Sequence, residues 1–417
     1  MSKTLIDTEG KSFTASFSSN SSALQKITYC TPHALMLLFL FFSPFTQYTS
    51  INEICFYISS GLFLFSVCSR QTWIVLRTPL AIVFLLFLLW AVAGIPTALN
   101  KPNTVHDIYA HWIKYVVIYY LLVNYFQKPG ELVRLATLIV ITGCVYSVWY
   151  IAYFYFYLGN SWSARLVMYP YRDYFFTFSS MIAIGLIQHH KTAVLRALFT
   201  LALLCILVAA ILSQSRNVLL AVVIGSLIYM LKYPKTALCL LLAVIISVAA
   251  FPAFRERLKW GTLISSDRIS TNLITSEIIK HYPLFGIGFG MQTYGYPEFI
   301  DLQAYNKKIP KQFQKGVILG SPHNLLMDVT VRTGILGGLF FLAIYWIEGM
   351  MLYSIYRRSQ NAGIKRWGLV LAASFAAFLI QSLFGDAAFS IQAIIFFVIL
   401  SMTTILWRQY QRASLRD

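Results

Sequence analysis

Acidic residues are scarce in this sequence. Its 417 residues include 15 Asp and Glu against 33 Lys and Arg, which gives a formal net charge of +18, and only 12% of all residues are charged. A soluble domain has about 25% charged residues, so this chain has about half the polar surface that an ordinary soluble enzyme needs. Disorder is excluded as well, because 58% of the residues are hydrophobic.

Patterns that bind metals, cofactors or nucleic acids are also missing from the sequence. The six cysteines lie in or beside apolar segments without metal-ligand spacing, so we interpret them as buried thiols that act as small apolar groups. No paired external carboxylates and no G-x-S-x-G, H-E-x-x-H or P-loop motif occur. The Lys and Arg residues form short clusters rather than a surface patch. We therefore expect no metal, no cofactor and no nucleic-acid partner.

The chain has long apolar runs instead, and about twelve of them approach the ~20 residues that a helix needs to cross a bilayer. This predicts an all-α integral membrane protein with about 12 transmembrane helices. The tenth run is longer than one span, and polar residues at its start indicate a helical piece outside the membrane. The predicted runs are 32–49, 52–69, 79–97, 109–126, 135–158, 174–190, 197–213, 218–231, 236–253, 324–356, 369–385 and 389–407.

Basic residues set the predicted orientation of these spans. With the N-terminus in the cytoplasm, over half of the Lys and Arg residues fall in short inner segments, as the positive-inside rule requires. An even number of spans then puts the C-terminus in the cytoplasm too. The predicted parts are a cytoplasmic tail at 1–31, the first nine spans in 32–253, a long external loop at 254–322, a helix start with three spans in 323–407, and a cytoplasmic tail at 408–417.

Arginines occur at the outer ends of the predicted spans. Arg216 lies in the short polar link 213–217, where no acid is near it in sequence. A guanidinium beside hydrocarbon is costly unless it is paired, so its partner lies elsewhere in the fold or is a ligand phosphate, which guanidinium binds bidentately. Snorkelling to lipid headgroups is the alternative. A second outer link holds Arg165 and Arg172 among aromatic residues that include Trp162.

The long external loop is basic, which suggests an anionic ligand or anionic lipid headgroups. Ser265-Ser266-Asp267 forms a helix N-cap before 268–280. We expect this helix to lie at the membrane surface with Arg268 turned toward the site. Its predicted apolar face has Ile269, Leu273 and Ile274, and its polar face has Arg268, Asn272 and Thr275.

Two further motifs border this loop. Residues 281–290 end the helix in a glycine-rich turn, which we interpret as a tight apolar turn because no βαβ unit surrounds it. His323 stands at the start of a helix, where the helix dipole favours the neutral imidazole that a general base requires, although a lone His is more often structural. Asp328 and Arg332 are spaced i, i+4 and predict an intrahelical ion pair.

Three of these motifs occur together in an order that resembles the O-antigen ligase and polymerase superfamily of bacterial inner-membrane proteins. They are Ser215-Arg216 at the outer end of a mid-chain span, Arg268 to Gly290 as an Arg-led helix and a His-x-Pro-Leu-x-Gly-x-Gly-x-Gly turn, and His323-Asn324 followed by Thr333-Gly334. Gln214, Asn217 and Arg332 depart from the pattern of this superfamily, and no family role is assigned to Arg332.

The resemblance implies a GT-C-like glycosyltransferase of the inner membrane with its active site on the periplasmic side. It would move a polysaccharide from undecaprenyl pyrophosphate to a sugar hydroxyl of lipid A–core, with inversion and without a metal. Arg216 and Arg268, supported by Arg165 and Arg172, would hold the pyrophosphate, and His323 would be the base. Both substrates and the surrounding membrane lipids are its expected partners.

Two other functions remain open from the sequence. An O-antigen polymerase would join repeat units on undecaprenyl pyrophosphate and has the same motifs. A transporter of lipid-linked sugars would use the arginines to bind phosphate but would not need His323. Such a transporter often has acids within its spans, for which Glu348 and Asp386 are the candidates.

Overall fold

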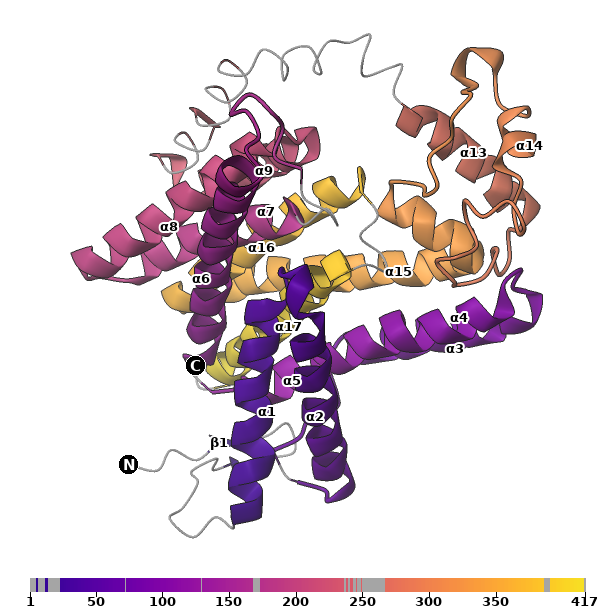
Figure 1. Ribbon diagram of the computed structural model, residues 1–417. Helices are drawn as coiled ribbons and strands as arrows, with labels where there is room; N and C mark the ends of the chain where they lie inside the picture. Colours follow the sequence, from indigo (N-terminus) through magenta and orange to yellow (C-terminus); the bar gives the residue numbers. More distant parts are fainter. Residues whose placement is uncertain are drawn as a thin grey trace.

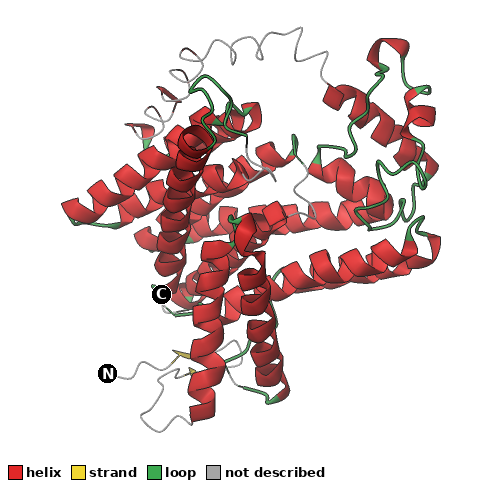
Figure 2. Ribbon diagram, in the orientation of Figure 1, coloured by secondary structure: helices red, strands yellow, loops and turns green. Residues whose placement is uncertain are grey.

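The computed structural model describes residues 5–6, 12–13, 23–71, 73–128, 130–167, 173–235, 267–385 and 391–415, with single positions between 238 and 249. These residues are mostly helical (Figure 2). Strands β1 (Leu5–Ile6) and β2 (Ser12–Phe13) form one short antiparallel pair. Most of the predicted run 236–253 lies outside the described residues.

The N-terminal helices form two neighbouring groups (Figure 1). Helices α1 and α2 pack side by side as a hairpin, while α3 packs against the π-helical turn Ile108–Ile113 and α5. A π-helical turn joins α4 to α5. The bounds are α1 Ala23–Phe42, 3₁₀ turn Thr46–Tyr48, α2 Thr49–Cys68, α3 Ala81–Ala93, 3₁₀ turn Ile95–Thr97, α4 Lys101–Asp107, π turn Ile108–Ile113 and α5 Lys114–Tyr125.

The remaining helices form the central bundle and a smaller unit beside it. In the bundle are α6 Glu131–Ile151 with the π-helical turn Ala152–Tyr157, α7 Asp173–His189, α8 Ala193–Leu212, α9 Arg216–Met230, α15 Leu325–Arg358, α16 Ala362–Ser382 and α17 Ile391–Ser414. The smaller unit has α13 Asp267–His281, α14 Leu302–Asn306 and the 3₁₀ turn Lys311–Phe313, and α13 packs on α15.

Six helices among the described residues are long and apolar enough to cross a membrane. This finding is consistent with an integral membrane protein and agrees with the all-helical fold class predicted from the apolar runs. The six are Thr46–Cys68, Glu131–Tyr157, Ala193–Leu212, Leu325–Arg358, Ala362–Ser382 and Ala393–Ser414. Shorter apolar helices cover Ile27–Phe42, Ala81–Thr97 and Arg216–Met230.

Contacts of α16 fix the directions of the bundle helices. Tyr174 at the start of α7 donates a hydrogen bond to the carbonyl of Gln381 at 3.0 Å, and Arg366 near the start of α16 donates to Gln188 at 2.8 Å. Helices α7 and α16 are therefore antiparallel. The short links 190–192 and 213–215 then return the chain twice, so α9 begins at the end of the bundle where α7 begins and α16 ends.

Helix α15 is broken at Gly334, which agrees with the predicted separate piece at the start of the tenth run. Gly334 has φ 75°, a left-handed conformation that favours glycine. A Cβ there would lie 1.8 Å from the carbonyl oxygen of Leu284. The backbone N–H of Ile335 donates instead to the carbonyl of Pro283 at 2.8 Å. The segment that follows α13 therefore packs against the backbone at the break in α15.

Helix α13 confirms the helix predicted after the Asp267 N-cap, but its predicted faces are partly wrong. The face that packs inward includes Thr271, Ile274 and Thr275, whereas Ile269 is half-buried. Thr275 can be buried because its hydroxyl bonds both to the Thr271 carbonyl, at 2.7 Å, and to the Tyr294 hydroxyl, at 2.9 Å. These partners satisfy the hydroxyl of a residue that the sequence pattern assigned to the polar face.

Candidate functional site

Arg216 is the first residue of α9 and follows a short polar link that other segments contact. The link begins with buried Ser213, and Gln214 has φ 45°. Arg165 donates a hydrogen bond from Nε to the Ser213 carbonyl at 2.9 Å, and the Leu166 backbone N–H donates to Leu212 at 2.9 Å. The structure therefore brings the two predicted links together, with Arg165 beside the segment that leads into Arg216.

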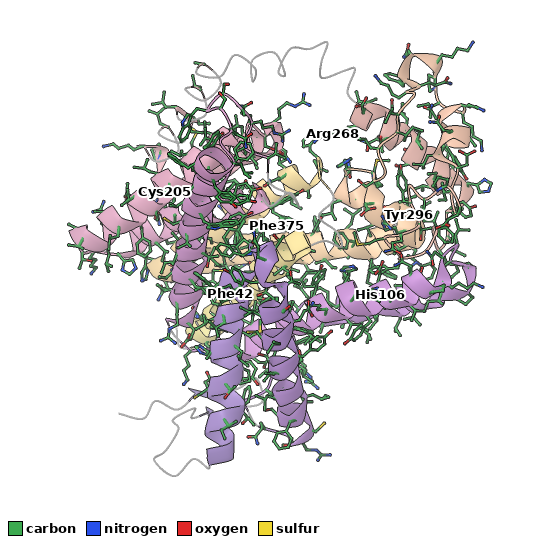
Figure 3. All side chains as sticks on the ribbon, viewed as in Figure 1. Phe42, His106, Cys205, Arg268, Tyr296 and Phe375 are labelled. Carbon is green, nitrogen blue, oxygen red and sulfur yellow. The ribbon has the colours of Figure 1, made fainter. Side chains whose placement is uncertain are left out.

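Arg268 lies near the start of α13, where it is labelled in Figure 3. Its guanidinium carbon is 5.9 Å from the centre of the Phe384 ring, which follows α16. This distance allows a cation–π contact, which is stronger where water is excluded. Since α16 ends where α9 begins, Arg268 and Arg216 approach the same end of the bundle from elements far apart in sequence.

Arg172 lies outside the described residues, directly before α7. The position of its side chain in the predicted arginine group therefore stays a prediction.

His323 precedes the N-cap of α15 and is half-buried. Its φ of 50° is unusual for a residue other than glycine. Asn324 caps the helix, because its side-chain oxygen accepts a hydrogen bond from the Met327 backbone N–H at 3.2 Å. The short link 359–361 makes α16 antiparallel to the part of α15 that follows the break at Gly334, so that part begins on the side of the bundle where α16 ends.

The glycine-rich turn is bound to protein groups rather than open to a phosphate. Ile287 and Gly288 donate their backbone N–H groups to the carbonyls of Val331 and Arg332, at 2.9 and 3.1 Å. A Cβ at Gly286 would lie 2.4 Å from the Val331 carbonyl oxygen. The turn therefore closes against the last residues before the break in α15, in agreement with its interpretation as a structural turn.

Residues of α4 that the sequence pattern did not indicate hold the other side of this turn. Asp107, which is 3% exposed, accepts the Met291 backbone N–H at 2.6 Å through Oδ2. Asn103 accepts the Gln292 N–H at 2.8 Å. The only local signal is the helix start, where Asn100 accepts the Asn103 N–H at 3.2 Å. That signal predicts a cap but not its long-range partner.

The predicted ion pair of Asp328 and Arg332 is present and buried. Arg332 Nε lies 2.7 Å from Asp328 Oδ1, and the two side chains are 3% and 4% exposed. Arg332 also donates from Nη1 to the carbonyl of Gly290. The pair therefore joins the start of α15 to the glycine-rich turn, which gives Arg332 a structural role.

Replacing Asp328 with Asn is expected to destabilise the protein by about 3–5 kcal/mol, because it leaves the Arg332 charge buried without its carboxylate. Thermal unfolding of the purified variant in detergent measures this loss. The matched control is Glu277→Gln, which breaks the exposed pair of Lys280 and Glu277 and should cost about 1 kcal/mol or less. Equal stability of the Asp328 and Glu277 variants would contradict the structural role of the buried pair.

These features are consistent with a helical membrane protein whose candidate polar site lies where several bundle helices begin or end. Residues 201–342 match the family model described as O-antigen ligase. The matched segment contains Arg216, Arg268 and His323, and it supports membership of this chain in the O-antigen ligase superfamily, as the three motifs predicted. Members of this family are glycosyltransferase-like enzymes of lipopolysaccharide synthesis. No curated protein matches the chain.

Proposed function

We propose that this protein is an O-antigen ligase that transfers a polysaccharide from undecaprenyl pyrophosphate to a sugar hydroxyl of lipid A–core on the periplasmic side of the inner membrane. The observation that carries the proposal is that Arg165, Arg216 and Arg268 belong to elements that meet at one end of the bundle. Two of these arginines lie in the first turn of a helix, where backbone N–H groups and the helix dipole also favour an anion.

The reaction requires little more than cations and one base. The acceptor hydroxyl attacks the anomeric carbon, a new C–O bond forms, and the bond to the pyrophosphate oxygen breaks with inversion. Undecaprenyl pyrophosphate leaves with the electron pair, and Arg216 and Arg268 stabilise its charge. His323 takes the proton of the acceptor hydroxyl, a role for which its position before the α15 N-cap is suitable. This route uses no metal ion and no nucleotide.

A reconstituted transfer assay tests the proposal. Purified protein receives undecaprenyl-pyrophosphate glycan and lipid A–core, with or without EDTA. We expect glycan on lipid A–core, formed at the same rate with EDTA. Longer polyprenyl-linked chains without that product would instead identify a polymerase. If folded protein made neither product and moved lipid-linked sugars across the vesicle membrane, the transporter would replace both transferases.

Of the two acids that a transporter would use within its spans, one lies within the described residues. Glu348 lies in α15 and is fully buried, while Asp386 lies outside the described residues. An acid at this depth of a membrane helix marks an ion or substrate path in many transporters. The transferase proposal assigns Glu348 no chemical step, so Glu348→Gln should retain transfer activity in the same assay. Loss of transfer in a folded Gln variant would count against that assignment.

A further inference from the structure

A stacked aromatic pair lies beside the two links that contain Arg165 and lead into Arg216. The rings of Tyr155 and Trp162 are 4.5 Å apart and inclined by only 9°. Tyr155 belongs to the π-helical turn after α6 and is buried, whereas Trp162 is 55% exposed. Phe156 meets Trp162 edge to face at 5.6 Å. The buried ring therefore supports the exposed indole and holds it as a flat surface.

The segment that carries Trp162 is fixed to the link before Arg216. Tyr155 donates its hydroxyl hydrogen to the Ala164 carbonyl at 2.8 Å. Arg165 holds the Ser213 carbonyl at 2.9 Å, and Gln214 donates back to the Ser163 carbonyl at 3.4 Å. Trp162 thus belongs to a loop that these hydrogen bonds hold in place. Other residues of the loop contact the link 213–215 before Arg216 directly.

Two polar side chains border the exposed indole in the sequence. Ser161 and Ser163 flank Trp162, are both exposed, and have hydroxyl oxygens 2.9 Å apart. A sugar ring has an apolar face of C–H groups and a rim of hydroxyls, so it matches an aromatic plane bordered by hydroxyl groups. A lipid chain would match the plane but offers no polar group to the two serine hydroxyls, which would exchange water for hydrocarbon with only each other and the Ser163 backbone N–H as partners.

We propose that Trp162, supported by Tyr155, binds a sugar ring of the donor glycan close to its pyrophosphate. This inference rests on the proposed function, because the donor is chosen for the nearness of the loop to Arg216. This sugar platform, the Trp162 indole stacked on Tyr155, would hold the first sugars while the arginines hold the phosphates. Trp162 is then a substrate-binding residue that acts on donor affinity rather than on the chemical step.

A second aromatic stack on the same turn provides the matched control. Trp149, Tyr153 and Tyr157 follow one another at i, i+4, with ring distances of 5.5 and 5.3 Å. Tyr157 is 78% exposed and adjoins exposed Phe156 and Leu158 rather than serines. Aromatic residues in apolar surroundings at a helix end are typical of the membrane interface. We assign this stack to lipid contact.

The experiment compares Trp162→Ala, Trp162→Phe and Tyr157→Ala in the reconstituted transfer assay. Loss of one stacking ring is expected to raise the KM for the donor about tenfold in Trp162→Ala, with kcat and the KM for lipid A–core nearly unchanged. Trp162→Phe should recover most of this affinity, and Tyr157→Ala should behave as the parent. Thermal unfolding in detergent checks that each variant is folded.

Calorimetric titration with lipid-free donor glycan separates this inference from the proposed function. If the parent protein transfers glycan but Trp162→Ala keeps its donor KM and its affinity for the free glycan, the sugar platform is wrong. A change confined to the KM for lipid A–core would also overturn the assignment to the donor. If the parent transfers nothing, the ligase proposal fails, while weaker glycan binding by Trp162→Ala alone would still support the platform.

Discussion

Replacement of His323 with alanine is expected to lower kcat by about 10²–10⁴-fold, the usual contribution of a positioned general base. The acceptor hydroxyl would then have to lose its proton to water during the attack. The KM for the donor should change little, because the arginines and not the imidazole hold the pyrophosphate. Steady-state transfer kinetics in the reconstituted assay measure both quantities.

Because His323 has a left-handed backbone conformation, His323→Ala changes both the backbone strain and the proton acceptor. A second variant distinguishes these two effects on activity. Alanine is disfavoured at φ 50°, whereas asparagine adopts this conformation more readily. His323→Asn should therefore fold at least as well as His323→Ala and be equally inactive, because an amide cannot accept a proton at neutral pH. An asparagine variant with more than about a tenth of the parent kcat would rule out His323 as the base.

Local features of this chain could be predicted from its sequence. The i, i+4 spacing predicted the ion pair of Asp328 and Arg332, although not its burial, and the Ser265-Ser266-Asp267 pattern predicted the start of α13. The polar start of the tenth run predicted a helical piece outside the membrane. Helix α15 is indeed broken at Gly334, while the position of the first piece outside the membrane stays a prediction. These predictions succeed because helix geometry and capping depend on residues within about one turn of each other.

Features that depend on distant partners could not be predicted in the same way. Thr275 is buried because Tyr294 satisfies its hydroxyl, and Arg268 is located by Phe384, more than 100 positions later. Asp107 holds the glycine-rich turn through Met291, although nothing in the sequence near α4 indicates this contact. Hydrophobic periodicity reports which face of a helix is apolar, but it contains no information about which polar group another segment will bring to it.

The exposures of two cysteines also differ from their sequence interpretation. Cys55 is buried, as expected of a small apolar residue, but Cys30 and Cys68 are exposed. The side chains of an apolar helix that faces lipid are not covered by protein. In a membrane protein, an apolar sequence therefore does not predict burial by other parts of the protein. Sequence composition therefore predicted the segments in which these cysteines lie but not what covers them.

Arg216→Lys and Arg268→Lys are each expected to lower kcat by about 10²–10³-fold, although the positive charge is retained. Arginine presents a planar fork that binds two phosphate oxygens at once, and the ammonium group of lysine cannot reproduce this geometry. If the arginines only reached lipid headgroups, lysine would replace them with little loss. The matched control is Lys311→Ala, which removes an exposed positive charge from the same basic loop and should leave kcat nearly unchanged.

A double-mutant cycle between Arg216 and Arg268 then tests whether they act on one pyrophosphate. Groups that stabilise the same leaving group lose their effects non-additively, whereas distant independent sites add within about 0.3–0.5 kcal/mol. We expect Arg216→Lys combined with Arg268→Lys to be only slightly slower than either single variant. Additive losses would mean that each arginine serves a separate function, and the meeting of α9, α13 and α16 at one end of the bundle would then have only structural significance.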